Sequence, residues 1–196
     1  MHMSRTGRRN VLASMLLASL MLLASLSGLR TASAQGTSAE APEVVADIKA
    51  AYLYKFGNYV DWPDPSFESP GSPIRIGVVG AGRLAEVLTQ MVAGRTVNGR
   101  RMEVRSLLPG DSFAGLHILF IANVGDEQLK KVFSATAGQP ILTVTDSDRA
   151  FSFGGMINFV VDDGRLRFDI APGPAGPAGL HISARLLTTA RKVING

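Results

Sequence analysis

Apolar residues recur every three or four positions from Glu43 to Val60, in the sequence EVVADIKAAYLYKFGNYV. This spacing places them on one side of an α-helix and predicts a long helix at the start of the folded part of the chain. Pro63 ends that helix, because a residue that precedes proline is driven out of the helical region. The next residues, 64–73, are rich in Pro, Ser and Gly and predict a loop.

Between residues 74 and 145, short apolar runs alternate with amphipathic stretches of helical spacing. The runs predict strands at 74–79, 102–107, 117–121 and 141–145, and the stretches predict helices at 84–92 and 127–135. Alternation of this kind is typical of an α/β domain that has a mostly parallel sheet with helices on both faces.

The last third of the chain has a different pattern. Residues 156–161 and 166–170 are two strand-like runs that flank Asp163-Gly164, a two-residue signature of a β-hairpin. The hairpin adds a C-terminal antiparallel pair to the sheet, which then has about six strands. Residues 171–179 contain too much Gly and Pro to predict a helix, whereas Ser183 can cap a final helix whose apolar face extends to Ile194.

The N-terminus has the composition of an export signal. Three arginines at positions 5, 8 and 9 precede an uncharged run of 16 residues, and Ala32-Ser33-Ala34 fits the small-x-small pattern of a signal peptidase site. A membrane anchor is the alternative, but a spanning helix needs about 20 apolar residues. We therefore predict a signal peptide at 1–34, a disordered leader at 35–42 and a single domain at 43–196, located in the periplasm of a Gram-negative bacterium.

The charge balance and the absence of cysteine exclude several classes of function. The chain has 20 Lys and Arg against 16 Asp and Glu, but the first 34 residues hold four arginines and no acid, so the remainder is neutral. The basic balance therefore gives no indication of nucleic-acid binding. The chain contains no cysteine, which excludes disulfides, a thiol nucleophile and cysteine-based metal sites.

One motif resembles a cofactor site. Residues 80–85, GAGRLA, fit the G-x-G-x-x-[GA] pattern of dinucleotide binding and lie between a predicted strand and a predicted helix. The pattern also requires an acid at the end of the next strand, where this chain has Ser106 and Leu107. We interpret the glycines as a strand-to-helix turn and predict no cofactor.

No arrangement of residues predicts catalysis. His117 begins a buried strand and is interpreted as structural, and the chain lacks the common motifs of serine and metal hydrolases. Asp162 and Asp163 lie in the predicted hairpin turn, where Asp is favoured for its backbone conformation. We predict no catalytic residue, no metal site and no enzymatic activity.

Two groups of residues are candidates for an interaction surface. The first contains Lys55, Tyr59 and Trp62 at the end of the first helix, a mixture of aromatic and charged side chains that is common in binding hot spots. Trp62 could instead fill the end of the sheet as part of the core. The second group is Arg165 and Arg167, which alternate with Leu166 and Phe168 and so face away from the core. These arginines could bind a partner or be simply solvated.

Several stretches, taken together and in order, resemble the YfiR family of periplasmic regulators. They are Lys49–Phe56 with Trp62-Pro63, Gly94–Arg100, His117–Ile121, Gly154–Phe159 with Val161–Phe168, and Gly179–Leu187. The resemblance implies a regulator that binds the periplasmic domain of an inner-membrane diguanylate cyclase of the YfiN type and represses it. Cyclic di-GMP and biofilm formation would then fall.

The resemblance further implies an outer-membrane lipoprotein of the YfiB type that sequesters the repressor, and a homodimer. The chain departs from the family in two respects. It has no cysteine, so redox control through a disulfide is excluded, and residues 171–179 are richer in Pro and Gly than in relatives.

A periplasmic small-molecule sensor is the alternative function. Ligands of α/β domains bind at the carboxyl ends of the parallel strands. His181 and Arg185, at the start of the last predicted helix, are the candidate anion-binding groups for such a ligand.

Overall fold

The structure is a computed structural model that describes residues 40–108, 110–122 and 124–195, with side chains from residue 43 onward. The chain divides into two units, and the described residues belong to the second, Ser38–Gly196. The predicted signal peptide and most of the predicted leader lie outside the described residues. Among the described helices, none has both the length and the apolar character needed to cross a bilayer.

The described residues form four α-helices, three short 3-10 helices and ten strands. The helices are α2 (Glu40–Phe56), α3 (Gly82–Val92), α4 (Asp126–Thr136), α5 (Ala184–Thr189), η2 (Asp64–Ser66), η3 (Phe151–Phe153) and η4 (Gly173–Ala175). The strands are β1 (Val60–Asp61), β2 (Ile74–Val79), β3 (Thr96–Val97), β4 (Arg100–Leu107), β5 (Ile118–Ile121), β6 (Leu142–Thr145), β7 (Ile157–Asp162), β8 (Arg165–Ile170), β9 (His181–Ile182) and β10 (Lys192–Val193).

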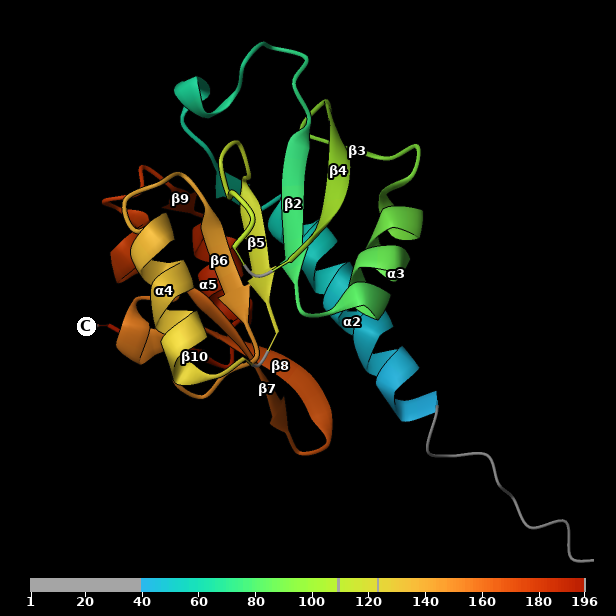
Figure 1. Ribbon diagram of the computed structural model, residues 1–196, viewed down its shortest axis with the longest axis vertical. Helices are drawn as coiled ribbons and strands as arrows, with labels where there is room; N and C mark the ends of the chain where they lie inside the picture. Colours follow the sequence, from blue (N-terminus) through green and yellow to red (C-terminus); the bar gives the residue numbers. More distant parts are fainter. Residues whose placement is uncertain (1–39, 109, 123, 196) are drawn as a thin grey trace, which may run out of the picture. The chain divides into compact units, whose positions relative to one another are not determined.

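Eight of the described strands form one sheet in the order β10-β8-β7-β6-β5-β2-β4-β3, and β1 and β9 form a separate antiparallel pair (Figure 1). Strands β4, β2, β5, β6 and β7 run parallel, and β8 returns antiparallel to β7. The predicted α/β class and mostly parallel sheet are confirmed. The sheet has more strands than the six predicted, because the sequence analysis missed the two-residue strands.

Helices cover both faces of the sheet, as predicted. The larger core lies under α2 and α3, where Leu53 and Phe56 of α2 and Leu88 of α3 are completely buried. Each such side chain contributes about 2–3 kcal/mol through removal of apolar surface from water. The smaller core lies under α4, around Leu129 and Val132. Figure 1 shows α2 and α3 on one side of the central strands and α4 on the other.

The first helix differs from its prediction at both ends. It begins at Glu40, so residues 40–42, assigned to the leader, are helical, and it ends at Phe56 rather than near Pro63. Glycine follows at position 57, and the backbone N–H groups of Asn58 and Tyr59 close turns on carbonyls three residues earlier. The helix does not continue, because the backbone groups of residues 60–61 form hydrogen bonds with the antiparallel strand at residues 181–182 instead.

The last helix is also shorter than predicted. Ser183 caps it as expected, accepting a hydrogen bond from the Leu186 N–H at 3.3 Å. However, the helix ends at Thr189, and residues 192–193 form β10, an edge strand parallel to β8. Arg191 holds the connection between α5 and β10 in place. Its backbone N–H donates to the Phe168 carbonyl at 2.8 Å, and its guanidinium makes two hydrogen bonds to the Asp169 carboxylate. The prediction of a helix through Ile194 was therefore wrong.

The hairpin turn at Asp163-Gly164 is confirmed, with φ of 47° and 70° at its two central residues. A second turn of the same type, Asn98-Gly99, has φ of 51° and 77° and joins β3 to β4. Positive φ at both central residues gives the twist that tight hairpins require.

Candidate functional site

Residues from two distant parts of the chain meet at the end of the sheet where the parallel strands begin. Strand β1 pairs with β9, so that Asp61 lies opposite His181. The two side chains approach at 3.5 Å and are largely exposed. In addition, the Arg185 guanidinium lies over the Tyr59 ring, 5.9 Å from its centroid. We call Tyr59, Asp61, Trp62, His181 and Arg185 the amino-end cluster.

Trp62 has a structural role within this cluster. Its indole N–H donates a hydrogen bond to the His117 carbonyl at 3.0 Å, and its ring meets the His117 ring edge-on at 6.0 Å. The side chain remains half-exposed. The structure therefore supports the interpretation of Trp62 as a plug of the sheet end, while part of its surface stays accessible. Lys55 is exposed in the last turn of α2, near the same end of the sheet.

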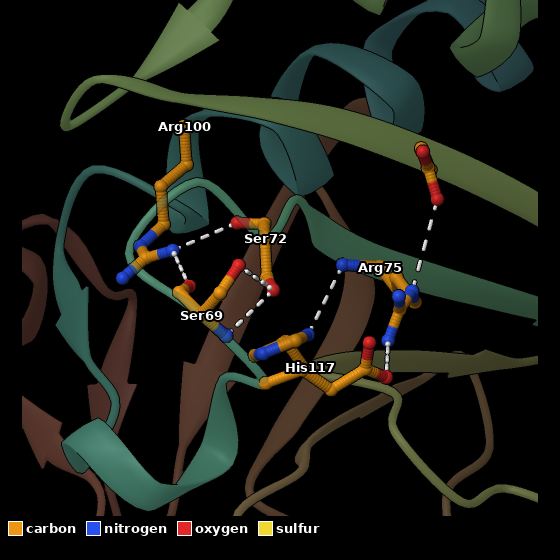
Figure 2. A network of polar contacts seen from close by, with 7 residues as sticks. Ser69, Ser72, Arg75, Arg100 and His117 are labelled. Carbon is orange, nitrogen blue, oxygen red and sulfur yellow. Dashed lines mark hydrogen bonds and ion pairs between the residues drawn. The ribbon is translucent and has the colours of Figure 1, made fainter.

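A stack of three side chains contacts the amino-end cluster through Trp62. The Phe67 ring lies on the His117 ring at 4.4 Å between centroids, and the Arg100 guanidinium lies over Phe67 at 3.7 Å. His117 Nδ1 also accepts a hydrogen bond from the Arg75 N–H at 3.1 Å, which joins the stack to the start of β2 (Figure 2). The stack therefore spans from the loop to the sheet.

Two arginines hold the 64–73 loop against the sheet, through contacts that Figure 2 shows. One amino group of Arg100 donates to the carbonyls of Ser69 and Ser72, at 3.2 and 2.8 Å. Arg75 pairs with Glu68 of the loop at 3.0 Å. The loop is therefore fixed on the sheet although its sequence is rich in Pro, Ser and Gly.

His117 is buried, with 1 % of its surface exposed. Burial lowers the pKa of its imidazole to about 4, and the positive charges of Arg75 and Arg100 act in the same direction. The ring is therefore neutral at neutral pH, which agrees with the structural role predicted for His117.

Arg165 and Arg167 lie on β8 close to the β7–β8 turn, at the end of the sheet opposite to the amino-end cluster (Figure 1). Both are exposed, while Leu166 is half-buried and Phe168 is buried, as the alternation predicted. The structure therefore brings Tyr59, Trp62, His181 and Arg185 to one end of the sheet, with Lys55 near the same end, and places Arg165 and Arg167 at the other end.

His181 and Arg185 do not lie at the carboxyl ends of the parallel strands, where the sequence analysis expected a ligand. That they bind an anion stays a prediction. They lie at the amino ends of the parallel strands, because β9 pairs with β1 and β1 leads directly to Trp62, which contacts His117 just before β5. They therefore cannot line a crevice at the carboxyl ends. Lys49 and Asp146, which the sequence analysis did not select, lie there instead. Asp146 directly follows a predicted strand, and that position was the signal that could have identified it.

The glycine motif at residues 80–85 forms a turn between β2 and α3. Gly80 has φ of +74°, and a Cβ there would lie 3.3 Å from the Cβ of Ala122, so any other residue would be strained at this position. A Cβ on Gly82 would meet open space. Within the described residues, no three His, Asp or Glu side chains come together as a metal site.

A protein-family model described as YfiR/HmsC-like matches residues 46–191. The match extends from α2 to Arg191 and includes both the amino-end cluster and the hairpin that carries Arg165 and Arg167. It confirms the family indicated by the sequence. The chain thus belongs to the YfiR/HmsC-like family, a family of periplasmic regulators of diguanylate cyclase signalling.

Proposed function

We propose that this protein is exported by cleavage after Ala34 and binds the periplasmic domain of an inner-membrane diguanylate cyclase of the YfiN type. Binding represses the cyclase and so lowers cyclic di-GMP and biofilm formation. Membership of the YfiR/HmsC-like family supports this proposal. The structural observation that carries it is the amino-end cluster, in which exposed charged side chains lie beside half-buried aromatic ones on a fixed support.

The composition of the amino-end cluster suits a protein interface. Tyr, Trp and Arg are the residue types that dominate binding energy at interfaces, and Tyr59, Trp62 and Arg185 lie together here. The Arg185–Tyr59 contact and the Asp61–His181 pair leave polar groups available for a partner. We expect Arg185 to be the main anchor, because a guanidinium above an aromatic ring can pair with a partner's carboxylate without losing its stacking contact.

The fixed loop and the fixed Trp62 should lower the entropic cost of binding a partner. A loop that becomes ordered only on association loses conformational entropy, and this loss weakens the observed affinity. The 64–73 loop is already fixed by the Arg100 and Arg75 contacts, and Trp62 is already bonded to the sheet. A partner would therefore bind a preorganised surface.

Repression would follow from a difference in affinity. A repressor that binds the inactive cyclase more tightly than the active one shifts the population by that difference. A shift from 99% active to 1% active needs roughly 5.5 kcal/mol of differential binding. A few well-placed anchors can supply this, because each contributes about 2 kcal/mol or more.

The hairpin with Arg165 and Arg167 is the second proposed contact surface. It lies at the other end of the sheet, so that one protein could hold two macromolecules at the same time. Two separate surfaces suit a protein with several partners: the cyclase, an outer-membrane lipoprotein of the YfiB type that sequesters the repressor, and a second copy of the chain.

The test is deletion of the protein followed by measurement of cellular cyclic di-GMP. We expect a rise, complemented by the wild type but not by a Tyr59→Ala, Arg185→Ala double variant. Arg101→Ala, which removes an exposed arginine of β4, is the matched control and should complement fully. No change in cyclic di-GMP on deletion under any growth condition would contradict repression, and full complementation by the double variant would move the contact away from the amino-end cluster.

A further inference from the structure

The topology creates a crevice at the end of the sheet opposite to the amino-end cluster. From β2 the chain moves to β4 on one side and then returns to β5 on the other side of β2. The carboxyl ends of β2 and β5 are therefore the point at which the strand order reverses, where open α/β sheets bind ligands. Two hollows of about 210 and 400 Å³ lie at this end, and they share Val45, Lys49 and Asp146.

One ion pair lines both hollows. Lys49 Nζ lies 2.5 Å from Asp146 Oδ2, with side chains that are 15 % and 23 % exposed. The ammonium also lies over two aromatic rings, 5.6 Å from the centroid of Phe120 and 6.0 Å from that of Phe159. One carboxylate and two ring faces are the groups that bind an organic ammonium in proteins. The Lys49 ammonium therefore occupies a cation-binding site formed by Asp146, Phe120 and Phe159.

The remaining cations of the crevice are already neutralised. Arg83 lines the smaller hollow and pairs with two carboxylates at 3.3 and 3.5 Å. Arg191 lines the larger hollow and also pairs with two carboxylates. In contrast, Asp146 Oδ1 has no hydrogen-bond partner and Asp148 makes no ion pair among the described residues. The unsatisfied groups of the crevice are therefore acceptors, which favour a cationic ligand over an anionic one.

We propose that this crevice binds a small organic amine whose ammonium group displaces that of Lys49 from Asp146. The bound ammonium lies against Asp146 and over Phe120 and Phe159. The apolar part of the amine extends into one of the hollows, against Val45 and the other apolar side chains that line them. Lys49 turns outward into water, which its four-carbon stem allows.

The displacement sets the expected affinity. A tethered group competes at a high effective concentration, so the wild-type protein should bind a simple monoamine weakly, on the order of millimolar. Removal of the Lys49 ammonium without loss of its apolar stem should therefore strengthen binding. Lys49→Met is this change, and we expect at least a tenfold lower Kd for n-butylammonium.

The test is a titration of the purified protein with n-butylammonium chloride at constant ionic strength, followed by calorimetry. Lys55→Met, which removes an exposed lysine from the same helix, is the matched control and should bind as the wild type does. Asp146→Asn should abolish binding, and sodium butyrate should bind none of the proteins. In the wild type, ¹³C-lysine NMR should show that the Lys49 Cε signal shifts on titration while the Lys55 signal does not.

The proposal is overturned if Lys49→Met binds the amine no better than Lys55→Met, or if butyrate binds as well as the amine. An unchanged Lys49 Cε signal in the wild type at saturating amine also overturns the proposal. This measurement needs no variant, so it remains decisive if Asp146→Asn does not fold. This site is independent of the proposed cyclase contact, because the amino-end cluster lies at the other end of the sheet.

Discussion

The buried His117 imidazole should make the protein sensitive to acid. Its pKa is lowered from 6.5 to about 4 in the folded state by burial. A depressed pKa means that the unfolded chain takes up a proton before the folded one does, so stability is complete above pH 6.5 and falls as the pH decreases towards 4. A difference of 2.5 pH units limits this loss to about 3 kcal/mol, of which about 2 kcal/mol is lost by pH 5.

His117→Asn isolates this effect. Asparagine is uncharged at every pH and its side-chain oxygen can accept the Arg75 N–H in place of Nδ1. The variant should be less stable than the wild type at pH 7.5, because the ring contacts with Phe67 and Trp62 are lost. However, its stability should fall less between pH 7.5 and pH 5, by about 2 kcal/mol.

The measurement is urea denaturation at pH 7.5, 6 and 5, followed by circular dichroism and linear extrapolation. Titration of carboxylates is common to both proteins and cancels in the difference between them. His181→Asn removes an exposed histidine outside the stack and controls for the loss of an imidazole as such. Parallel loss of stability in the wild type and His117→Asn would refute the claim that a neutral His117 is buried in the native state.

Two further predictions concern the backbone and the loop. Gly80→Ala should destabilise the protein by roughly 1–2 kcal/mol, because an L-residue must adopt φ of +74° beside Ala122; Gly82→Ala, at a position with open space, should be neutral or slightly stabilising, and thermal unfolding of both variants checks this. Arg100→Ala should release the 64–73 loop, since it removes both carbonyl contacts and the stacking on Phe67. Hydrogen exchange in residues 64–73 should then be faster than in the wild type and in Arg101→Ala, and equal rates in all three proteins would contradict the role given to Arg100.

The central sheet was predictable because its signals are local. Residues 118–121 are apolar over their whole length, and the runs 74–79 and 141–145 are interrupted only by Arg75 and by Thr143 and Thr145. Strands buried on both faces have such nearly continuous apolar sequences. The β7–β8 turn was predictable for a similar reason, because Asp163-Gly164 fits the positive φ values that the turn requires. In each case the decisive residues are neighbours in the sequence.

The two-residue strands were not predictable in this way. Residues 60–61 and 181–182 are too short to show a period, and each becomes a strand only because the other lies beside it. The same is true of residues 192–193, whose conformation depends on the Arg191–Asp169 contact. Since the amino-end cluster is built on such a pair, its residues could be selected one by one from the sequence, but their meeting could not be predicted.

Strand β10 has a consequence for the hairpin that it borders. It is only two residues long and pairs with β8 at Asp169 and Ile170. Among the described residues, no strand lies beside Arg165–Arg167 on that side of β8. The Leu166 carbonyl accepts a hydrogen bond from the Tyr52 hydroxyl at 3.4 Å, so an incoming strand that extends the ladder there must replace this one contact. The flanking arginines discourage a second copy of the same hairpin by charge repulsion. They leave the position open to an extended segment that carries acidic side chains.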